Sequence, residues 1–238
     1  DMNTSQTAAP IVGAQSPDET AAVFKKLTLR LLPFLTLCYV VSYIDRANIA
    51  FAKLQFMSDL GFSEAAYGLG AGLFFVGYVL FEVPSNVMLR RVGVRRTLLR
   101  IMALWGLVSC AMMFVSTPAQ FYVMRFLLGA AEAGFFPGVI FYLTYWFPAS
   151  RRGRVTGYLM MGAAIAGIIG GPLATWIMVH AAGVLSLKGW QWLFLVEGAP
   201  AVLLGVVAFF YLSDRPADAR WLSNREKTIG NHAEPRQS

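Results

Sequence analysis

The chain has 238 residues, of which 57% are hydrophobic and only 14% are charged, and its formal net charge is +7. A soluble domain usually has about 25% charged residues, so this composition excludes an ordinary water-soluble protein and indicates a membrane protein. The positive charge alone is also typical of nucleic-acid-binding proteins, and the positions of the basic residues decide between the two classes.

Apolar residues come in six long stretches of about 20 residues, each long enough at about 1.5 Å per residue to cross about 30 Å of hydrocarbon. In chain order the predicted spans run from Leu27 to Ile44, Ala65 to Leu89, Leu98 to Val115, Phe121 to Phe147, Val155 to His180 and Trp190 to Leu212. The sequence therefore predicts an all-α, polytopic membrane protein with one bundle of six transmembrane helices.

Helix-capping residues mark several boundaries. Ser16, followed by Pro17 and Glu19, predicts a capping box at the start of the first helix. Thr117 to Gln120 repeats the pattern before the fourth span, and the short loop there requires the third and fourth helices to be antiparallel neighbours. A further box, Ser223 to Glu226, is expected to end at Gly230 in the polar tail.

The chain divides into three parts on this basis. Residues 1–24 form a polar N-terminal tail that lacks a basic n-region, so we expect no secretory signal peptide. Residues 25–213 form the transmembrane bundle, and residues 214–238 form a second polar tail.

The basic residues lie in alternate loops. Sixteen of the twenty lie within, or a few residues from, the segments before the first span, between the second and third, between the fourth and fifth, or after the sixth. By the positive-inside rule both termini are expected in the cytoplasm of a multi-pass cell-membrane protein. The basic excess thus indicates topology and contact with anionic lipid, and we expect no nucleic-acid partner.

Four ionisable residues interrupt the apolar stretches: Asp45 and Arg46 near the predicted outer end of the first span, and Arg125 and Glu132 in the fourth. Arg125 and Glu132 are two helical turns apart and share a face. The small residues after Arg125, from Gly129 to Gly134, predict room for water or a ligand beside the charges.

Two interpretations of these charges remain open. As structural ties, Asp45 pairs with Arg125 and joins the first and fourth helices. As functional groups, Arg46 or Arg125 attracts an organic anion while Asp45 and Glu132 exchange a proton, since ionisable groups inside a membrane usually mark ion and substrate pathways.

Further residues have weaker assignments. Glu82 and Glu197 are interpreted mainly as tethers to arginines, whereas Tyr43 and Tyr78 are candidate ligand contacts or packing residues. The GxxxG motifs are expected to pack helices tightly, and they comprise Gly68 and Gly72, Gly153 and Gly157, and Gly167 and Gly171 followed by Pro172.

No motif of an enzyme is present, so we expect neither catalysis nor a bound metal or cofactor. Cys38 and Cys110 both fall inside predicted spans, where a free cysteine acts as a small hydrophobic residue. His180 lies at a predicted helix end and His232 in the tail.

Several motifs in order resemble the major facilitator superfamily: "LRRVGVRRTLLR" between the second and third spans, Arg125 with Gly129, and "GIIGGP" in the fifth. Within that superfamily, "YIDRANIAFA", "FEVPSN", "GWQWLFLVEGAP" and "SDRPADARWLS" resemble the anion:cation symporter group, which includes permeases for tartrate, glucarate, galactonate and phthalate. The resemblance covers nearly all of residues 25–223.

This resemblance implies a secondary active transporter that carries an organic acid anion with protons by alternating access. It implies proton coupling by Asp45 and Glu132, and anion binding by Arg46 and Arg125 with Tyr43 and Tyr78 lining the cavity.

The resemblance also implies gating or packing roles for two groups of residues: Arg91, Gly93 and Arg95, and Gly167, Gly171 and Pro172. Arg90 stands where the superfamily motif has an aspartate, so the usual aspartate latch is not expected there.

Members of the superfamily have two six-helix bundles, whereas this chain has one. The resemblance therefore implies a second bundle as partner, with the tail from residue 214 as the start of a linker. The alternative is a non-transporting or truncated six-helix scaffold in which the buried charges are structural ties.

Overall fold

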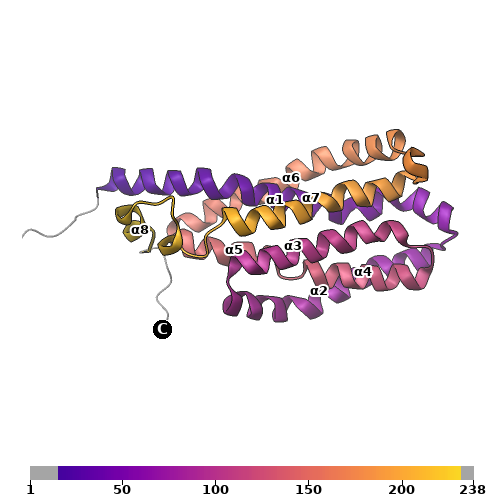
Figure 1. The fold of residues 1–238 in the computed structure, drawn as a ribbon, viewed down its shortest axis with the longest axis horizontal. Coiled ribbons are helices and arrows are strands. Elements are labelled where there is room, and N and C mark those ends of the chain that lie inside the picture. The colour runs from indigo at the N-terminus through magenta and orange to yellow at the C-terminus, as the bar shows by residue number, and fades with distance from the viewer. Residues whose placement is uncertain (1–15, 232–238) are drawn as a thin grey trace, which may run out of the picture.

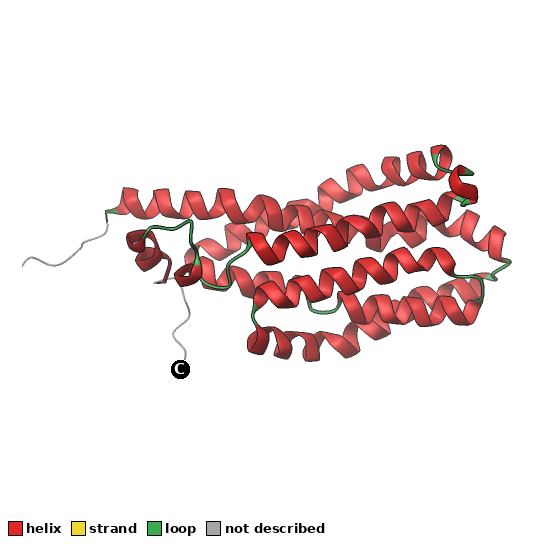
Figure 2. Ribbon diagram, viewed as in Figure 1, coloured by secondary structure: helices red, strands yellow, loops and turns green. Residues whose placement is uncertain are grey.

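The computed structural model describes residues 16–231, and every regular element in that range is helical (Figure 1, Figure 2). The elements are α1 (Pro17–Leu60), α2 (Glu64–Val92), α3 (Val94–Ala111), η1 (Met112–Phe114), α4 (Pro118–Glu132), α5 (Phe135–Trp146), α6 (Ala149–His180), η2 (Val184–Ser186), α7 (Gly189–Tyr211), η3 (Pro216–Asp218) and α8 (Asn224–Asn231). Six helical segments, the fourth of them made of α4 and α5 together, are long and apolar enough to cross a membrane, which confirms the predicted number of spans.

Helix α1 is longer than the span predicted from the sequence. It has 44 residues, roughly 66 Å at 1.5 Å per residue, and it continues past Ile44 to Leu60. The helix continues because Ile49, Ala52 and Phe56, spaced three and four residues apart, stay on its buried face. Asp45 and Arg46 therefore lie inside the helix, and their predicted position near its outer end is wrong.

The fourth span is interrupted rather than continuous from Phe121 to Phe147. Gly134, between α4 and α5, has a left-handed φ of +85°, which glycine adopts without a steric penalty. A Cβ atom at Gly134 would lie 2.5 Å from Ser85 Oγ, so α2 packs directly against the break. Helix α4 consequently ends at Glu132, one of the four charged residues.

The helices pack mainly in three pairs: α3 along α7, α2 along α4, and α1 along α6. Helices α3 and α4 also contact each other, as the short loop before Thr117 predicted. Large aromatic side chains fill the interior, and Trp105, Trp146 and Trp190 are fully buried. Both the start of α1 and α8 lie at the same end of the bundle (Figure 1).

The closest helix contacts occur at glycines outside the predicted GxxxG motifs. A Cβ atom at Gly129 of α4 would clash with Phe74 O of α2, and one at Gly77 of α2 would clash with Phe126 O of α4. The motif glycines with no such contact within 4 Å are Gly68, Gly72, Gly153, Gly157 and Gly167. Their predicted tight packing within this bundle is wrong, because motif spacing does not show which helix face meets a neighbour.

The predicted caps are largely confirmed. Glu19 N donates to Ser16 Oγ (3.1 Å), although the Glu19 side chain pairs with Arg225 (2.6 Å). Both bonds of the box between Ser223 and Glu226 are present. Helix α8 continues through Gly230, so its predicted end there is wrong. His232 and the rest of the tails, residues 1–15 and 232–238, lie outside the described residues.

Candidate functional site

One turn of α1 carries three polar side chains on the face directed into the bundle. Ser42, Asp45 and Arg46 are three and four residues apart, the spacing that places side chains above one another on a helix. Ser42 and Asp45 are buried, whereas the Arg46 side chain is 34% exposed. This turn therefore joins a buried polar site to an accessible cation.

Asp45 is held by three donors. Trp105 Nε1 and Ser109 Oγ of α3 each donate to the Asp45 carboxylate at 2.5 Å, and Asn48 Nδ2 donates at 3.1 Å. A buried carboxylate needs such donors to offset its loss of hydration. Asp45 is thus fixed against α3.

Glu132 of α4 forms an ion pair with Arg46 of α1. Arg46 Nη2 lies 2.7 Å from Glu132 Oε1, and Ser42 Oγ donates to the same oxygen at 2.8 Å. The Glu132 side chain is only 2% exposed, so the ion pair has one buried and one accessible partner. This asymmetry means that a ligand could reach Arg46 while Glu132 stays covered.

Arg125 is more deeply buried than Arg46, and its guanidinium lies over an aromatic ring. Its Cζ atom is 4.7 Å from the centre of the Phe74 ring, and Arg46 Cζ is 5.5 Å from the same centre. Arg125 is 3% exposed, and its Nε atom has no hydrogen-bond partner among the described residues. Two cations and two carboxylates thus share one site with balanced formal charge.

The two predicted tyrosines take different positions around Arg46. Tyr78 of α2 lies with its ring centre 5.4 Å from Arg46 Cζ, whereas Tyr43 is 40% exposed and packs edge-on against Tyr39. A cavity of about 130 Å³ opens beside Arg46 and Tyr43. It is lined by Tyr39, Ser42, Tyr43, Arg46, Phe135 and Phe136.

The structure corrects the predicted pairing of the charges. Within residues 16–231, Asp45 and Arg125 form no ion pair, and the ion pair between α1 and α4 is made by Arg46 and Glu132. The reason is the rotation of α1, which turns Asp45 towards α3 and Arg46 towards α4.

Two other predictions about the surroundings are wrong. Gly129 leaves no space for a ligand, because the Phe74 and Tyr78 backbone fills the room beside it. Glu197 is no tether, because neither of its carboxylate oxygens, both buried, has a hydrogen-bond partner in the described part of the chain. Glu82 is half-buried on α2, and its predicted tether stays a prediction.

The α2–α3 turn binds the segment that follows α7. Arg95 N donates to Asp214 Oδ1 (2.9 Å), Arg95 Nε donates to Phe209 O (2.8 Å), and a Cβ atom at Gly93 would lie 3.1 Å from Asp214 Oδ1. Arg91 is exposed. An aspartate therefore does tie this turn, although it comes from beyond the sixth span.

The predicted residues of the fifth span lie on α6, where Pro172 is inside the helix. A Cβ atom at Gly171 would make only an ordinary contact with Phe51 (3.7 Å), and one at Gly167 would face open space. Their gating role stays a prediction.

Sequence reasoning missed Ser42, Trp105, Ser109 and Asp214. Ser42 was detectable, since it lies three and four residues before the charged pair on the same helix face. The two α3 residues carry no such sign, because an indole or hydroxyl in an apolar span is common. No group of His, Cys, Asp or Glu suited to a metal occurs in the described range.

The sequence profile of the Major Facilitator Superfamily matches residues 35–237. The chain belongs to this superfamily. Its resemblance to this superfamily, inferred above from short motifs, is thereby confirmed.

Superfamily proteins with similar sequences come from several bacteria. The chain is 56% identical over 208 residues to "Putative metabolite transport protein NicT" of Pseudomonas putida, covering 87% of this chain and 48% of that protein. It is 54% identical over 211 residues to a "Putative tartrate transporter" of Agrobacterium vitis, with coverages of 88% and 48%. The chain spans about half the length of the curated relatives it matches, namely their N-terminal half.

Solved superfamily structures share the fold. A bacterial homologue of the human lysosomal transporter Spinster superposes with a TM-score of 0.69 at 21% identity, over 85% of this chain and 46% of that one. A variant of XylE superposes with a TM-score of 0.67 at 16% identity, over 87% and 49%. The six-helix bundle is therefore one half of the superfamily architecture.

Proposed function

We propose that this chain is the N-terminal half of a secondary active transporter that carries a small organic acid anion together with protons. The observation that supports this most directly is the ion pair between Arg46, which is partly exposed, and Glu132, which is buried. Arg46 lines a cavity, and guanidinium groups bind carboxylates by charge-assisted hydrogen bonds.

Coupling follows from competition for one cation. A carboxylate ligand and ionised Glu132 both require Arg46, so neither binds it fully while the other does. A proton added to Glu132 cancels the charge that holds Arg46, which then becomes available to the ligand. Proton and anion thus increase each other's affinity, as linkage between two sites requires.

The remaining residues have supporting roles in this proposal. Arg125 adds a fixed positive charge below Phe74, and Asp45 is a second proton-coupling acid held by α3. Tyr43 and Tyr78 flank Arg46 and line the route to it. Alternating access would move these groups against a second six-helix bundle, because transporter sites of this kind lie between two repeats.

The proposal includes location and substrate class. With six spans, both ends of the described chain lie at the same end of the bundle (Figure 1). Most basic residues belong to the segments that the order of the spans assigns to that side. We place that end in the cytoplasm by the positive-inside rule. The name of the tartrate relative favours hydroxy dicarboxylates and sugar acids as first candidates.

The test is uptake of labelled dicarboxylates and sugar acids into vesicles, with and without an inward proton gradient. The chain is assayed alone and as a two-half protein, meaning this chain continued by a second six-helix half. Gradient-dependent uptake of a panel member supports the proposal. If the two-half protein takes up a panel member at the same rate with and without the proton gradient, proton coupling is contradicted.

A structural scaffold is the second candidate, since three donors bind Asp45 and two bind Glu132. In that case the charges are static ties. The scaffold interpretation predicts that Asp45→Asn in the two-half protein lowers thermal stability while proton-dependent uptake persists, whereas the symport proposal predicts loss of that dependence.

A further inference from the structure

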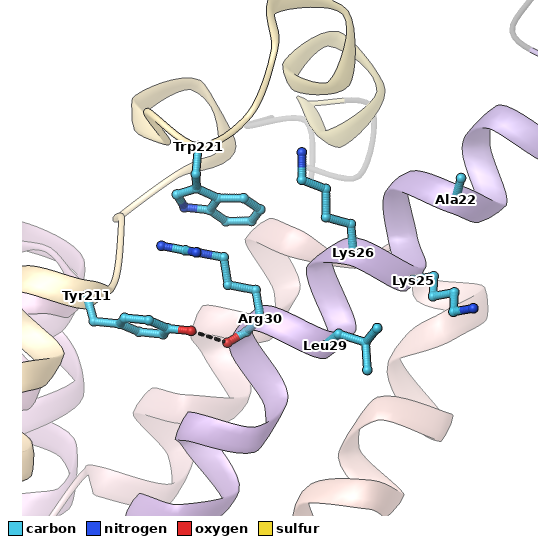
Figure 3. Close-up of a pocket in the computed structure, with 7 residues that line it drawn as sticks. All are labelled: Ala22, Lys25, Lys26, Leu29, Arg30, Tyr211 and Trp221. Carbon is cyan, nitrogen blue, oxygen red and sulfur yellow. Dashed lines mark hydrogen bonds between the residues drawn. The ribbon is translucent and has the colours of Figure 1, made fainter.

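A second basic site lies at the end of the bundle that holds the start of α1 and α8. We define it as the linker pocket, a hollow of about 660 Å³ between α1, the end of α7 and the segment that follows α7 (Figure 3). It is lined by Ala22, Lys25, Lys26, Leu29, Arg30, Tyr211 and Trp221. Three of these residues are basic and none is acidic.

Two aromatic rings fix the cation at the base of the linker pocket. Arg30 Cζ lies 4.9 Å from the centre of the Tyr211 ring and 4.8 Å from that of Trp221, so its guanidinium is held between them (Figure 3). Tyr211 also donates its hydroxyl to Arg30 O (2.9 Å), and Trp221 stacks on Trp146 with an interplanar angle of 8°. Arg30 is therefore pre-positioned, which lowers the entropy lost when a ligand binds.

The fixed donors have no acceptor. Arg30 Nε and Trp221 Nε1 are both buried without a hydrogen-bond partner among residues 16–231, and no carboxylate there pairs with Arg30. Buried donors are nearly always satisfied in folded proteins. With its faces covered by rings, the guanidinium has only its edge left, and this edge is suited to the oxygens of a phosphate.

Of the other two basic residues that line the pocket, Lys26 extends towards the segment that holds Trp221, whereas Lys25 points away from the Arg30 guanidinium (Figure 3). Lys26 Nζ lies 2.8 Å from Glu226 Oε1 of α8, whereas Lys25 is exposed and forms no side-chain bond within the described residues. Leu29, 66% exposed, lies on the same stretch of α1, where the helix passes from its polar start into the apolar span. The pocket thus combines positive charge with an adjacent apolar surface.

We infer that the linker pocket binds the phosphate headgroup of an anionic phospholipid. The position favours a lipid over a free anion, because Leu29 lies beside the cations and can contact the first methylene groups of an acyl chain. Basic pockets between transmembrane helices are a common site for acidic headgroups. A bound lipid would hold the segment after α7 against α1, and this inference does not depend on the transport proposal.

The experiment is a lipid titration of the purified chain in detergent by native mass spectrometry. Phosphatidylglycerol and phosphatidylcholine with identical acyl chains are compared. We expect tighter binding of the anionic lipid, and a loss of roughly fivefold in affinity for each of Lys26→Gln and Arg30→Gln. Arg96→Gln, which removes an exposed arginine of α3 outside the pocket, should leave the affinity unchanged.

Arg30→Gln also removes two ring contacts, and Lys26→Gln removes the pair with Glu226. Glu226→Gln breaks the same pair but keeps the Lys26 cation, so it should leave the affinity for the anionic lipid undiminished. Equal affinity for both lipids would overturn the inference. So would an equal loss with Arg96→Gln, which would indicate unspecific attraction to charge. Displacement of the lipid by inorganic phosphate at similar concentration would assign the site to a soluble anion instead.

Discussion

Arg46 and Glu132 form an ion pair of 2.7 Å that joins α1 to α4, with 34% of one side chain exposed and 2% of the other. Surface ion pairs usually contribute little to stability, and buried pairs are costly to form. Because Arg46 is the accessible partner, a carboxylate ligand can take the place of Glu132 beside it. The first two predictions follow from this arrangement.

Glu132→Gln in the two-half protein should abolish proton-driven accumulation while exchange of labelled for unlabelled anion persists. Glutamine keeps the shape of the side chain but cannot take up or release a proton. Uptake and exchange in vesicles measure both properties. Glu64→Gln is the matched control, since Glu64 pairs with Lys53 (2.8 Å) on the surface. Accumulation that survives Glu132→Gln would remove Glu132 from proton coupling.

Arg46→Ala should weaken anion affinity by about tenfold or more, because a charge-assisted hydrogen bond contributes roughly 1.5–3 kcal/mol. The affinity is measured by competition against a labelled substrate. Lys53→Ala removes a cation from the same helix outside the cavity and should change the affinity little. Unchanged affinity in Arg46→Ala would assign Arg46 to the structural tie between the helices.

Gly129→Ala should destabilise the bundle by roughly 1–3 kcal/mol, because the added Cβ atom would clash with Phe74 O. Gly68→Ala is the control within a predicted packing motif, and it should stay within about 0.5 kcal/mol because nothing lies near its Cβ position. Denaturant unfolding in detergent compares them. Equal effects would mean that α2 and α4 do not cross as described.

Glu197→Gln should leave the thermal unfolding temperature unchanged or raise it. Neither buried oxygen of Glu197 has a partner among the described residues, so no ion pair is lost, and an amide avoids the cost of a buried charge. The control is Glu132→Gln, which breaks the pair with Arg46 and should lower stability. A lower unfolding temperature for Glu197→Gln would indicate a partner for this carboxylate.

Helix α8 should detach from α1 at low pH. The hydrogen bond from Lys26 lowers the pKa of Glu226, so the pair adds stability above the ordinary glutamate pKa of about 4.3. That stability is lost as the pH falls through the lowered pKa. Tryptophan fluorescence reports the change, because Trp221 stacks on Trp146.

Glu226→Gln should weaken the docking of α8 at neutral pH and reduce its response to acid. The pair between Glu19 and Arg225 also joins α1 to α8, so Glu19→Gln separates the contributions of the two carboxylates. A fluorescence change at low pH of equal size in Glu226→Gln would assign the response to another group.

The sequence alone determined the six spans, the caps at Ser16 and Ser223, and the four charged residues that a membrane interior rarely contains. Hydrophobic length and capping are local properties, because each depends on residues a few positions apart. The family resemblance was available for the same reason, since its motifs are short and ordered along the chain.

Only the tertiary structure decided which charges meet. The rotation of α1 places Asp45 against Trp105 and Arg46 against Glu132, and a rotation of one residue, about 100°, would exchange those neighbours. The sequence does not specify how each helix is rotated, so it could not show that most GxxxG glycines face open space in this bundle. The break at Gly134 depends on close contact with Ser85 of α2, a residue far away in the sequence. Pairing and packing therefore depend on how whole helices are positioned, which no local pattern specifies.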